Sequence, residues 1–298
     1  MIRALVRSLG RVVGLLTGVY LTYVAVRGSR VIVHPDVRPF VPDVQDGPAS
    51  PADIGLEFEP VRFTTDDGFT LSGWLIPAAR ETRTAVIVLH GFSGHRLPEL
   101  AAFVPWLAER HNVLQFDFRG HGESDRGPVT LGAHERRDVA AAVGFLESRG
   151  LGPTALFGIS MGAAIAIVSA PELPVAAVIA DAAFAELRHP IASRMRTIGY
   201  PLSAAGSRVI VAAAALRTWS RLSDPARAVA RISPRALLLI APKDDLLISW
   251  RQSVRLFELA GEPKELFVVE GAGHAEAYAV DPVAYRTRVL DFLEKYLG

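Results

Sequence analysis

Short, nearly continuous apolar segments alternate with helical patterns from Val61 onward, and this alternation constrains the fold more than any other feature. Strands that are apolar on both sides must be covered on both sides, which is typical of the parallel sheets of α/β proteins. The predicted strands are Ala85–Leu89, Val113–Phe116, Ala155–Phe157, Ala176–Ala180, Ala236–Ile240 and Leu266–Val269. The predicted helices are Glu99–Arg110, His134–Arg149, Met161–Ala170, Ser249–Leu259 and Val283–Leu297. We therefore expect an α/β fold with a mostly parallel sheet and helices on both faces.

Two segments depart from this alternation. Arg62–Thr65 and Phe69–Ile76 are β-rich and are joined by an Asp-Asp-Gly turn, so the sheet is predicted to begin with an antiparallel hairpin. The connection that follows the strand ending at Ala180 is much longer than one crossover helix needs. Its surplus, about residues 190–223, predicts a small helical cap over the substrate pocket, because ligands of such sheets bind beyond the carboxyl ends of the strands. A surface insert with its own small core is the alternative interpretation.

The N-terminus carries an uncharged apolar run, Val12–Val26, between Arg11 and Arg27. The run is shorter than the roughly 20 residues that usually span a bilayer, but flanking arginines can extend outward to the headgroups. Arg3, Arg7 and Arg11 form a basic stripe suited to an anionic membrane surface. We predict a membrane-associated helix, most simply a single uncleaved anchor. A cleaved signal peptide and a helix lying in the interface are alternatives, although no small-x-small cleavage site follows the run.

Domain organisation follows from these segments. The membrane-associated helix is predicted over residues 1–33, and the arginines on its two sides leave its orientation open. Residues 34–60 contain six prolines, which predicts an extended connector rather than a packed element. The α/β domain is predicted over residues 61–298, with the cap inserted in it.

Composition excludes several classes of function. The formal net charge is +1, which gives no electrostatic basis for binding nucleic acid. Cysteine is absent, so a disulfide framework and cysteine-based zinc sites are excluded. No His, Asp or Glu spacing indicates a metal site, and no Gly-Lys-Ser/Thr sequence indicates a phosphate-binding loop. We expect neither a metal nor an organic cofactor.

The segment GISMG, residues 158–162, places a serine between two glycines where a predicted strand becomes a predicted helix. This is the setting of a nucleophile elbow, in which the serine lies on a tight, strained turn with its hydroxyl exposed. Gly158 and Gly162 fit this geometry because a Cβ at either position would collide across the turn. Close packing of a helix on the sheet is the alternative role for these small residues. We predict that Ser160 is a nucleophile.

A serine hydroxyl needs a base, and the base needs a carboxylate that fixes its tautomer. His274 follows the last strand in a Gly-Ala-Gly-His loop, at the same sheet edge as Ser160. Asp244 and Asp245 follow the preceding strand at that edge, and adjacent side chains point in different directions. We predict His274 as the base and Asp244 as the acid, with Asp245 as the alternative. Asp181 also follows a strand, but capping of the next segment is its simpler role.

The loop HGFSG, residues 90–94, follows strand Ala85–Leu89, where backbone must approach a ligand closely. We predict that the backbone N–H groups of Phe92 and Met161 form an oxyanion hole, because such donors stabilise the charge of an acyl-transfer intermediate. Ser93 lacks the strand-to-helix turn that would make it a nucleophile.

With these pieces in order, the sequence resembles serine hydrolases of the alpha/beta-hydrolase superfamily, within it the serine aminopeptidase and prolyl-oligopeptidase-like group. The resemblance runs from about Val61 to Leu297, most of the chain. The matching motifs are LHGFSG (89–94), FDFRGHGES (116–124), GISMG (158–162), APKDD (241–245) and GAGHAEAY (271–278).

The resemblance implies an eight-stranded, doubly wound sheet of the alpha/beta-hydrolase fold, with a cap after the sixth strand. It also implies the order Ser160, Asp244, His274 for nucleophile, acid and base, backbone donors at Phe92 and Met161, and a structural role for the loop at residues 119–124.

We therefore expect a membrane-associated serine hydrolase that cleaves small-molecule carboxylic esters through an acyl-enzyme. Thioesterase, acyltransferase and peptidase activities would use the same residues and are the alternatives within this class. A catalytically inactive, membrane-tethered binding protein is the alternative from another class.

Overall fold

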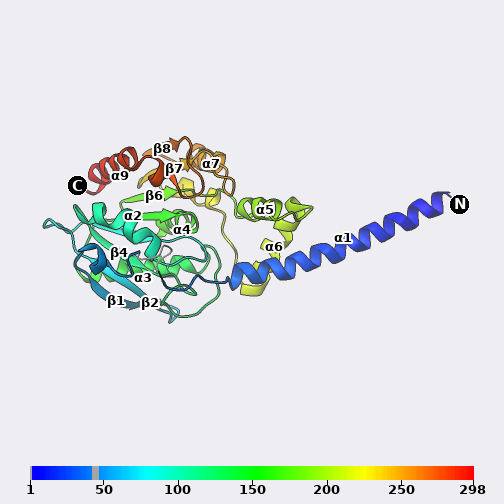
Figure 1. Ribbon diagram of the computed structural model, residues 1–298, viewed down its shortest axis with the longest axis horizontal. Helices are drawn as coiled ribbons and strands as arrows, with labels where there is room; N and C mark the ends of the chain where they lie inside the picture. Colours follow the sequence, from blue (N-terminus) through cyan, green and yellow to red (C-terminus); the bar gives the residue numbers. More distant parts are fainter. Residues whose placement is uncertain (1, 42–46) are drawn as a thin grey trace.

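A computed structural model describes residues 2–41 and 47–298, so residues 42–46 of the predicted connector lie outside the described part of the chain. One long helix projects from a globular α/β body (Figure 1). The strands are β1 (Glu59–Thr64), β2 (Thr70–Ile76), β3 (Ala85–Leu89), β4 (Asn112–Phe116), β5 (Thr154–Ile159), β6 (Ala177–Asp181), β7 (Ala236–Pro242) and β8 (Lys264–Val269). The helices are α1 (Ile2–Val33), α2 (Leu97–Ala108), α3 (Glu135–Ser148), α4 (Met161–Ser169), α5 (Arg188–Thr197), α6 (Ser203–Thr218), α7 (Arg251–Leu259), α8 (Ala277–Val280) and α9 (Pro282–Leu297).

The strands form a single sheet in the order β1-β2-β4-β3-β5-β6-β7-β8. β1 pairs antiparallel with β2, and β2 pairs antiparallel with β4. Every further pair, from β4·β3 to β7·β8, is parallel. The predicted eight-stranded, mostly parallel sheet with an antiparallel start is confirmed.

Both faces of the sheet are covered, and successive residues of β5 illustrate how. Leu156 belongs to a core with Val139 of α3 and Ile165 of α4 on one face. Phe157 points to the opposite face, where its ring lies 5.0 Å from that of Phe103 of α2. The period of two along a strand therefore sends alternate apolar residues into two separate cores. This explains why the strand reads as continuously apolar.

The long connection after β6 forms the helical hairpin α5–α6, which begins slightly earlier than the predicted residue 190. It does not enclose a core of its own. Ile210 of α6 is buried in one apolar cluster with Val24 and Ile32 of α1. A Cβ added to Gly28 would lie 2.6 Å from the Ile210 side chain, so the two helices are in close contact at this point. The cap therefore packs along the final part of the N-terminal helix (Figure 1).

The proline-rich segment ends in the first two residues of β1, Glu59 and Pro60, and its earlier described residues are not a free connector. Phe40 packs edge-on against His95, with ring centroids 5.3 Å apart, and the Arg38 N–H donates to the Ser93 carbonyl at 3.0 Å. A short 3₁₀ helix, Pro51–Ile54, leads into β1. The expectation of an unpacked connector is therefore wrong for these residues, because Phe40 supplies apolar area that the composition of the segment as a whole does not suggest.

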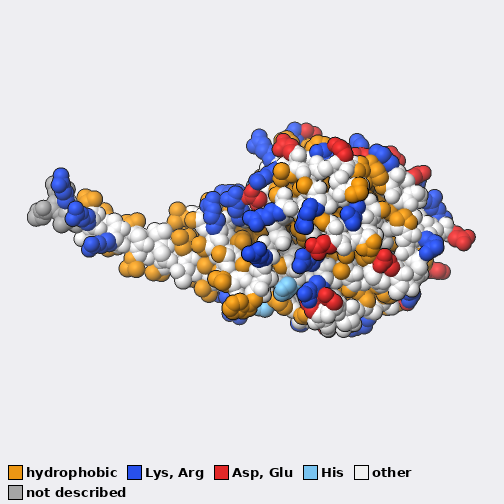
Figure 2. All heavy atoms as spheres, turned by 180° about the vertical axis from the view of Figure 1, so that it is seen from behind, with side chains coloured by type: hydrophobic (Ala, Val, Ile, Leu, Met, Phe, Trp, Pro, Cys, Tyr) orange, Lys and Arg blue, Asp and Glu red, His pale blue; other side chains and the backbone are white. Residues whose placement is uncertain are grey.

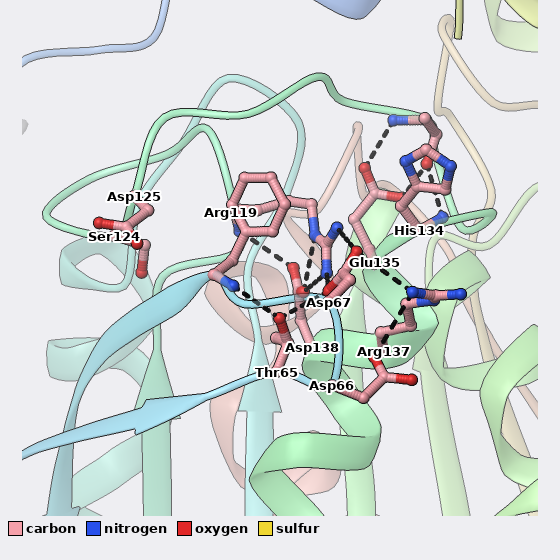
Figure 3. A network of polar contacts seen from close by, with 12 residues as sticks. Thr65, Asp66, Asp67, Arg119, Ser124, Asp125, His134, Glu135, Arg137 and Asp138 are labelled. Atoms are coloured by element: carbon pink, nitrogen blue, oxygen red, sulfur yellow. Dashed lines mark hydrogen bonds and ion pairs between the residues drawn. The ribbon is translucent and has the colours of Figure 1, made fainter. Parts of the chain in front are cut away.

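The loop at residues 119–124 has the structural role that the resemblance implies. The buried Arg119 guanidinium donates to both carboxylate oxygens of Asp67 at 2.7 and 2.9 Å, and its Nε donates to Asp138 at 2.8 Å (Figure 3). These contacts tie the β1–β2 turn, the loop after β4 and helix α3 together. The Arg119 hydrogen bonds hold the pKa of Asp67 well below its usual value. This ion-pair network supports the sheet edge and lies apart from Ser160.

Candidate active site

Ser160 lies on the turn between β5 and α4, with φ 54° and ψ −109°. A positive φ is costly for a residue with a Cβ and persists only where the surroundings enforce it. A Cβ on Gly158 would lie 2.3 Å from the backbone of Gly162, and a Cβ on Gly162 would lie 2.1 Å from the Leu89 carbonyl oxygen. Both glycines are therefore required by backbone contacts at the turn. The strand-turn-helix geometry expected for a nucleophile elbow is present.

His274 lies on the loop after β8 and reaches Ser160 across the sheet edge. Its Nε2 is 3.0 Å from the Ser160 Oγ, and its Nδ1 is 2.6 Å from a carboxylate oxygen of Asp245. The His274 side chain is 27% exposed, whereas that of Asp245 is 0% exposed. Three side chains from three separate loops therefore form one hydrogen-bonded chain that ends at a hydroxyl group.

The carboxylate in this chain belongs to Asp245, so the prediction of Asp244 is corrected in favour of the alternative. The Asp244 N–H donates to the Ala272 carbonyl at 2.9 Å, and the Asp244 side chain is exposed. The Asp245 Oδ1 accepts the N–H groups of Leu247 and Ile248 at 2.8 Å each, which leaves Oδ2 for His274. The turn after β7 thus decides which neighbouring aspartate faces inward.

Asp181, the third candidate, lies at the end of β6 and does not contact His274 by a hydrogen bond. Its Oδ2 accepts the Tyr285 hydroxyl at 2.8 Å, and its backbone carbonyl accepts the Ser160 N–H at 2.8 Å. Burial raises the pKa of Asp181 to about 7. The residue is therefore a buried support beneath the Ser160 turn rather than a cap on the following segment.

Phe92 and Met161, the predicted oxyanion donors, lie on two segments next to Ser160. Gly91 approaches the Ser160 side chain closely enough that an added Cβ would lie 3.8 Å from the Ser160 Cβ. Met161 is the first residue of α4, where N–H groups lack intrahelical partners. Within the described part of the chain, neither N–H donates to another backbone or side-chain group outside the helices and strands. Backbone donors at these two positions would be suited to a developing oxyanion.

His90 supports this loop, a role that was not predicted from its position in the sequence. Its Nδ1 lies 2.8 Å from the Gly91 carbonyl, and its Nε2 accepts the Phe118 N–H at 3.0 Å. Burial and the neighbouring His121 lower the pKa of His90 well below its usual value. A neutral imidazole that donates through Nδ1 satisfies both contacts. The position of His90 directly after β3 was visible in the sequence, but its partner Phe118 lies on a distant loop.

The start of the cap and the N-terminal segment each contact a loop that carries a site residue. The His189 Nε2, at the start of α5, accepts the Ser249 N–H at 3.3 Å in the loop that follows Asp245. On the other side, the contact of Arg38 with Ser93 brings the N-terminal segment next to Phe92. Two surface hollows, one lined by β8 and α9 and one by α3 and the segment after α6, contain none of these residues.

Comparison with known proteins places this geometry in context. Residues 86–287 match the model of a family described as the alpha/beta hydrolase family. An uncharacterized protein of Escherichia coli K12, YfhR, is 31% identical over 249 residues, which cover 79% of this chain and 80% of that protein. The esterase Pf2001 of Pyrococcus furiosus is 27% identical, with a TM-score of 0.74 over 88% of this chain and 98% of that one. A polyketide transferase of Penicillium sp., grgF, is 28% identical over 285 residues, which cover 80% of this chain and 96% of that protein.

Proposed function

The chain belongs to the alpha/beta hydrolase family, and on this premise we propose that it is a serine hydrolase that cleaves carboxylic esters through an acyl-enzyme on Ser160. The observation that carries the proposal is the hydrogen-bonded chain from the Ser160 Oγ through His274 to Asp245. An esterase is also among its structural neighbours. The family relationship makes the protein a hydrolase, whereas the serine mechanism and the ester substrate are our inference.

In the first half of the reaction, the Ser160 Oγ attacks the ester carbonyl carbon while the His274 Nε2 accepts the hydroxyl proton. The carbonyl oxygen becomes an oxyanion that accepts hydrogen bonds from the N–H groups of Phe92 and Met161. Asp245 stabilises the imidazolium that forms. The C–O bond to the leaving alkoxide then breaks, and His274 returns its proton to that oxygen, so an alcohol leaves and an acyl-enzyme remains.

In the second half, His274 removes a proton from water, and the hydroxide attacks the acyl carbon. Collapse of this intermediate breaks the bond to the Ser160 Oγ, which receives the proton from His274. The products are a carboxylic acid and the original enzyme. Besides the ester and water, the reaction uses only Ser160, His274, Asp245 and the two backbone donors.

Turnover of a short-chain p-nitrophenyl ester by the purified protein tests the proposal. The Ser160→Ala variant is expected to lose at least about a thousandfold in kcat/KM, because the nucleophile is removed. Ser148→Ala is the matched control, since Ser148 is an exposed residue at the end of α3. Retention of activity in Ser160→Ala contradicts the mechanism.

Acyl transfer is the second candidate, and the similarity to a polyketide transferase favours it. The acyl-enzyme would then pass its acyl group to an alcohol instead of water. Product analysis with a competing alcohol separates the two activities. Ester products in excess of the free acid support transfer, and acid alone supports hydrolysis.

We also propose that α1 anchors the enzyme in a membrane. Within the described residues, Leu5–Val33 is the one helical segment long and apolar enough to cross a bilayer. The packing of Val24 and Ile32 against Ile210 favours a retained helix, because cleavage after the apolar run would expose this part of the core. The proposed organisation is an anchor over residues 1–33, a connector over 34–60 and a hydrolase domain over 61–298.

A further inference from the structure

Helix α6 of the cap runs beside α1 in the same direction. At the start of α6, the Tyr20 hydroxyl donates to the Pro201 carbonyl at 2.6 Å. Farther along, Gly28 lies against Ile210. The turn between α5 and α6 therefore lies at the level of Tyr20, far from the end of α1 that enters the globular body (Figure 1).

The length of α1 limits how the helix can cross a bilayer. At 1.5 Å per residue, Tyr20 lies about 20 Å before the end of α1 at Val33. The part of α1 beyond the cap, Ile2–Val19, is about 27 Å long and its uncharged part, Val12–Val19, only about 12 Å, whereas the hydrocarbon core of a bilayer is about 30 Å thick. If the uncharged run Val12–Val26 lies in hydrocarbon, the boundary of the hydrocarbon is at Val26. Tyr20 and the α5–α6 turn beside it then lie about 9 Å below this boundary.

The composition of this turn suits such a position. Residues 197–207, which we call the cap tip, contain no charged side chain. Ile198 and Leu202 are each 53% exposed, and Tyr200 between them is also exposed. Tyrosine is a residue that favours the membrane interface. An apolar turn that is exposed in water but lies beside an apolar anchor helix presents one continuous surface to lipid.

Charges mark the boundary of this surface. Arg196 and Arg208 flank the cap tip and are both exposed. A Cβ on Gly206 would contact both Met195 and Val24, so these three residues lie at one level along α1. Arg196 and Arg208 are close to them in the chain and therefore lie within about one to two helical turns of Arg27, which follows the uncharged run of α1. Arginine and lysine side chains gather where the projecting helix meets the globular body (Figure 2). Basic residues at this level suit the anionic headgroups of a bilayer.

We propose that the cap tip inserts into the same bilayer leaflet as α1, with Arg27, Arg196 and Arg208 in the headgroup layer. The cap is then a second membrane contact that fixes the tilt of the globular body. As a consequence that rests on the proposed esterase function, the site lies close to the bilayer surface and takes long-chain, membrane-dissolved esters. The contact between Arg38 and Ser93 places the oxyanion loop only a few residues after the end of α1.

Site-directed fluorescence tests insertion independently of activity. The chain contains no cysteine, so a single cysteine can carry an environment-sensitive label. Ile198→Cys is the test position, Leu16→Cys on the exposed face of α1 is the positive control, and Ser148→Cys on α3 is the aqueous control. The full chain is reconstituted in vesicles of phosphatidylcholine and phosphatidylglycerol that contain doxyl-labelled lipid.

We expect lipid quenching at position 198 to be at least half that at position 16, and quenching at position 148 to be close to zero. Quenching at 198 as low as at 148, while 16 is quenched, overturns the proposal. The proposal is also overturned if the label at 198 is shielded from water but not quenched by lipid, and if this shielding increases with protein density. That result indicates contact with a second copy.

A charged cap tip tests the substrate consequence. Ile198→Glu with Leu202→Glu is expected to lower turnover of a long-chain ester in vesicles about tenfold or more, while turnover of a soluble short-chain ester changes less than about twofold. Val283→Glu, at an exposed apolar residue of α9, is the matched control. Equal turnover of the vesicle ester by wild type and the double variant overturns this consequence. Absence of turnover with both esters in the wild type contradicts the esterase function and leaves the fluorescence result decisive for insertion.

Discussion

Asp245→Asn tests whether Asp245, rather than Asp244, is the acid of the proposed mechanism. The Asp245 Oδ1 accepts two backbone N–H groups, and Oδ2 faces the His274 Nδ1 at 2.6 Å. In the variant, the amide oxygen must remain at the Oδ1 position to accept those two N–H groups. The amide NH₂ is then directed at Nδ1. His274 is driven into the tautomer that carries its proton on Nε2, and this nitrogen can no longer accept the proton of Ser160.

The magnitude follows from the lost charge and the wrong tautomer. A carboxylate about 4 Å from the imidazolium stabilises it by about 4 kcal/mol at an effective dielectric constant of about 20. At about 1.4 kcal/mol for each tenfold change in rate, this alone corresponds to about 10³ in kcat. The tautomer change raises the expected loss toward about 10⁴, the effect known for this substitution in serine protease triads.

Initial rates with a short-chain p-nitrophenyl ester measure this effect, and Asp244→Asn is the matched control. Asp244 is exposed and its contact with Ala272 uses only the backbone, so its variant is expected to keep activity within about threefold. Thermal unfolding verifies that both variants are folded. A loss of more than about a hundredfold in Asp244→Asn, with near-normal activity in Asp245→Asn, would refute the assignment.

Two further predictions concern stability. Burial raises the pKa of Asp181 to about 7, so the folded state retains a proton that the unfolded state releases near pH 4. The stability that this proton contributes is therefore lost as the pH rises from about 4 to about 7. The loss is about 1.4 kcal/mol for each pH unit in this range. Asp181→Asn should flatten the decrease in unfolding free energy between pH 4 and pH 7 in urea titrations, and an unchanged slope would count against a buried, protonated Asp181. Gly162→Ala should lower the unfolding free energy by about 3 kcal/mol or more and abolish activity, because its Cβ would lie 2.1 Å from the Leu89 carbonyl oxygen. Gly144→Ala in α3, where a Cβ meets nothing within 4 Å, should be neutral or stabilising by up to about 1 kcal/mol, and similar losses in both variants would contradict the packing argument.

The fold and two of the three site side chains were predictable because local patterns encode them. Apolar strands such as β5 supply both cores through the period-two alternation of Leu156 and Phe157. Ser160 and His274 are marked by small neighbours and by their positions directly after strands, whose carboxyl ends meet at one edge of the sheet.

The choice between Asp244 and Asp245 could not be read from the sequence, because it depends on a hydrogen bond to Ala272 on another loop. The roles of His90 and Asp181 depend likewise on Phe118 and Tyr285, which lie far away along the chain. The packing of α6 on α1 joins segments separated by about 180 residues and uses Gly28, which has no periodic signal of its own. Contacts of this kind are set by tertiary structure rather than by local propensity.

Covalent labelling with a fluorophosphonate tests the central claim most directly, since it requires an activated serine but no knowledge of the natural substrate. The intact protein should acquire one phosphonyl adduct, which peptide mass spectrometry should assign to Ser160. His274→Ala should slow labelling by at least about a hundredfold, because the hydroxyl loses its base. A folded protein that acquires no adduct, or acquires it at a serine other than Ser160, would contradict the account.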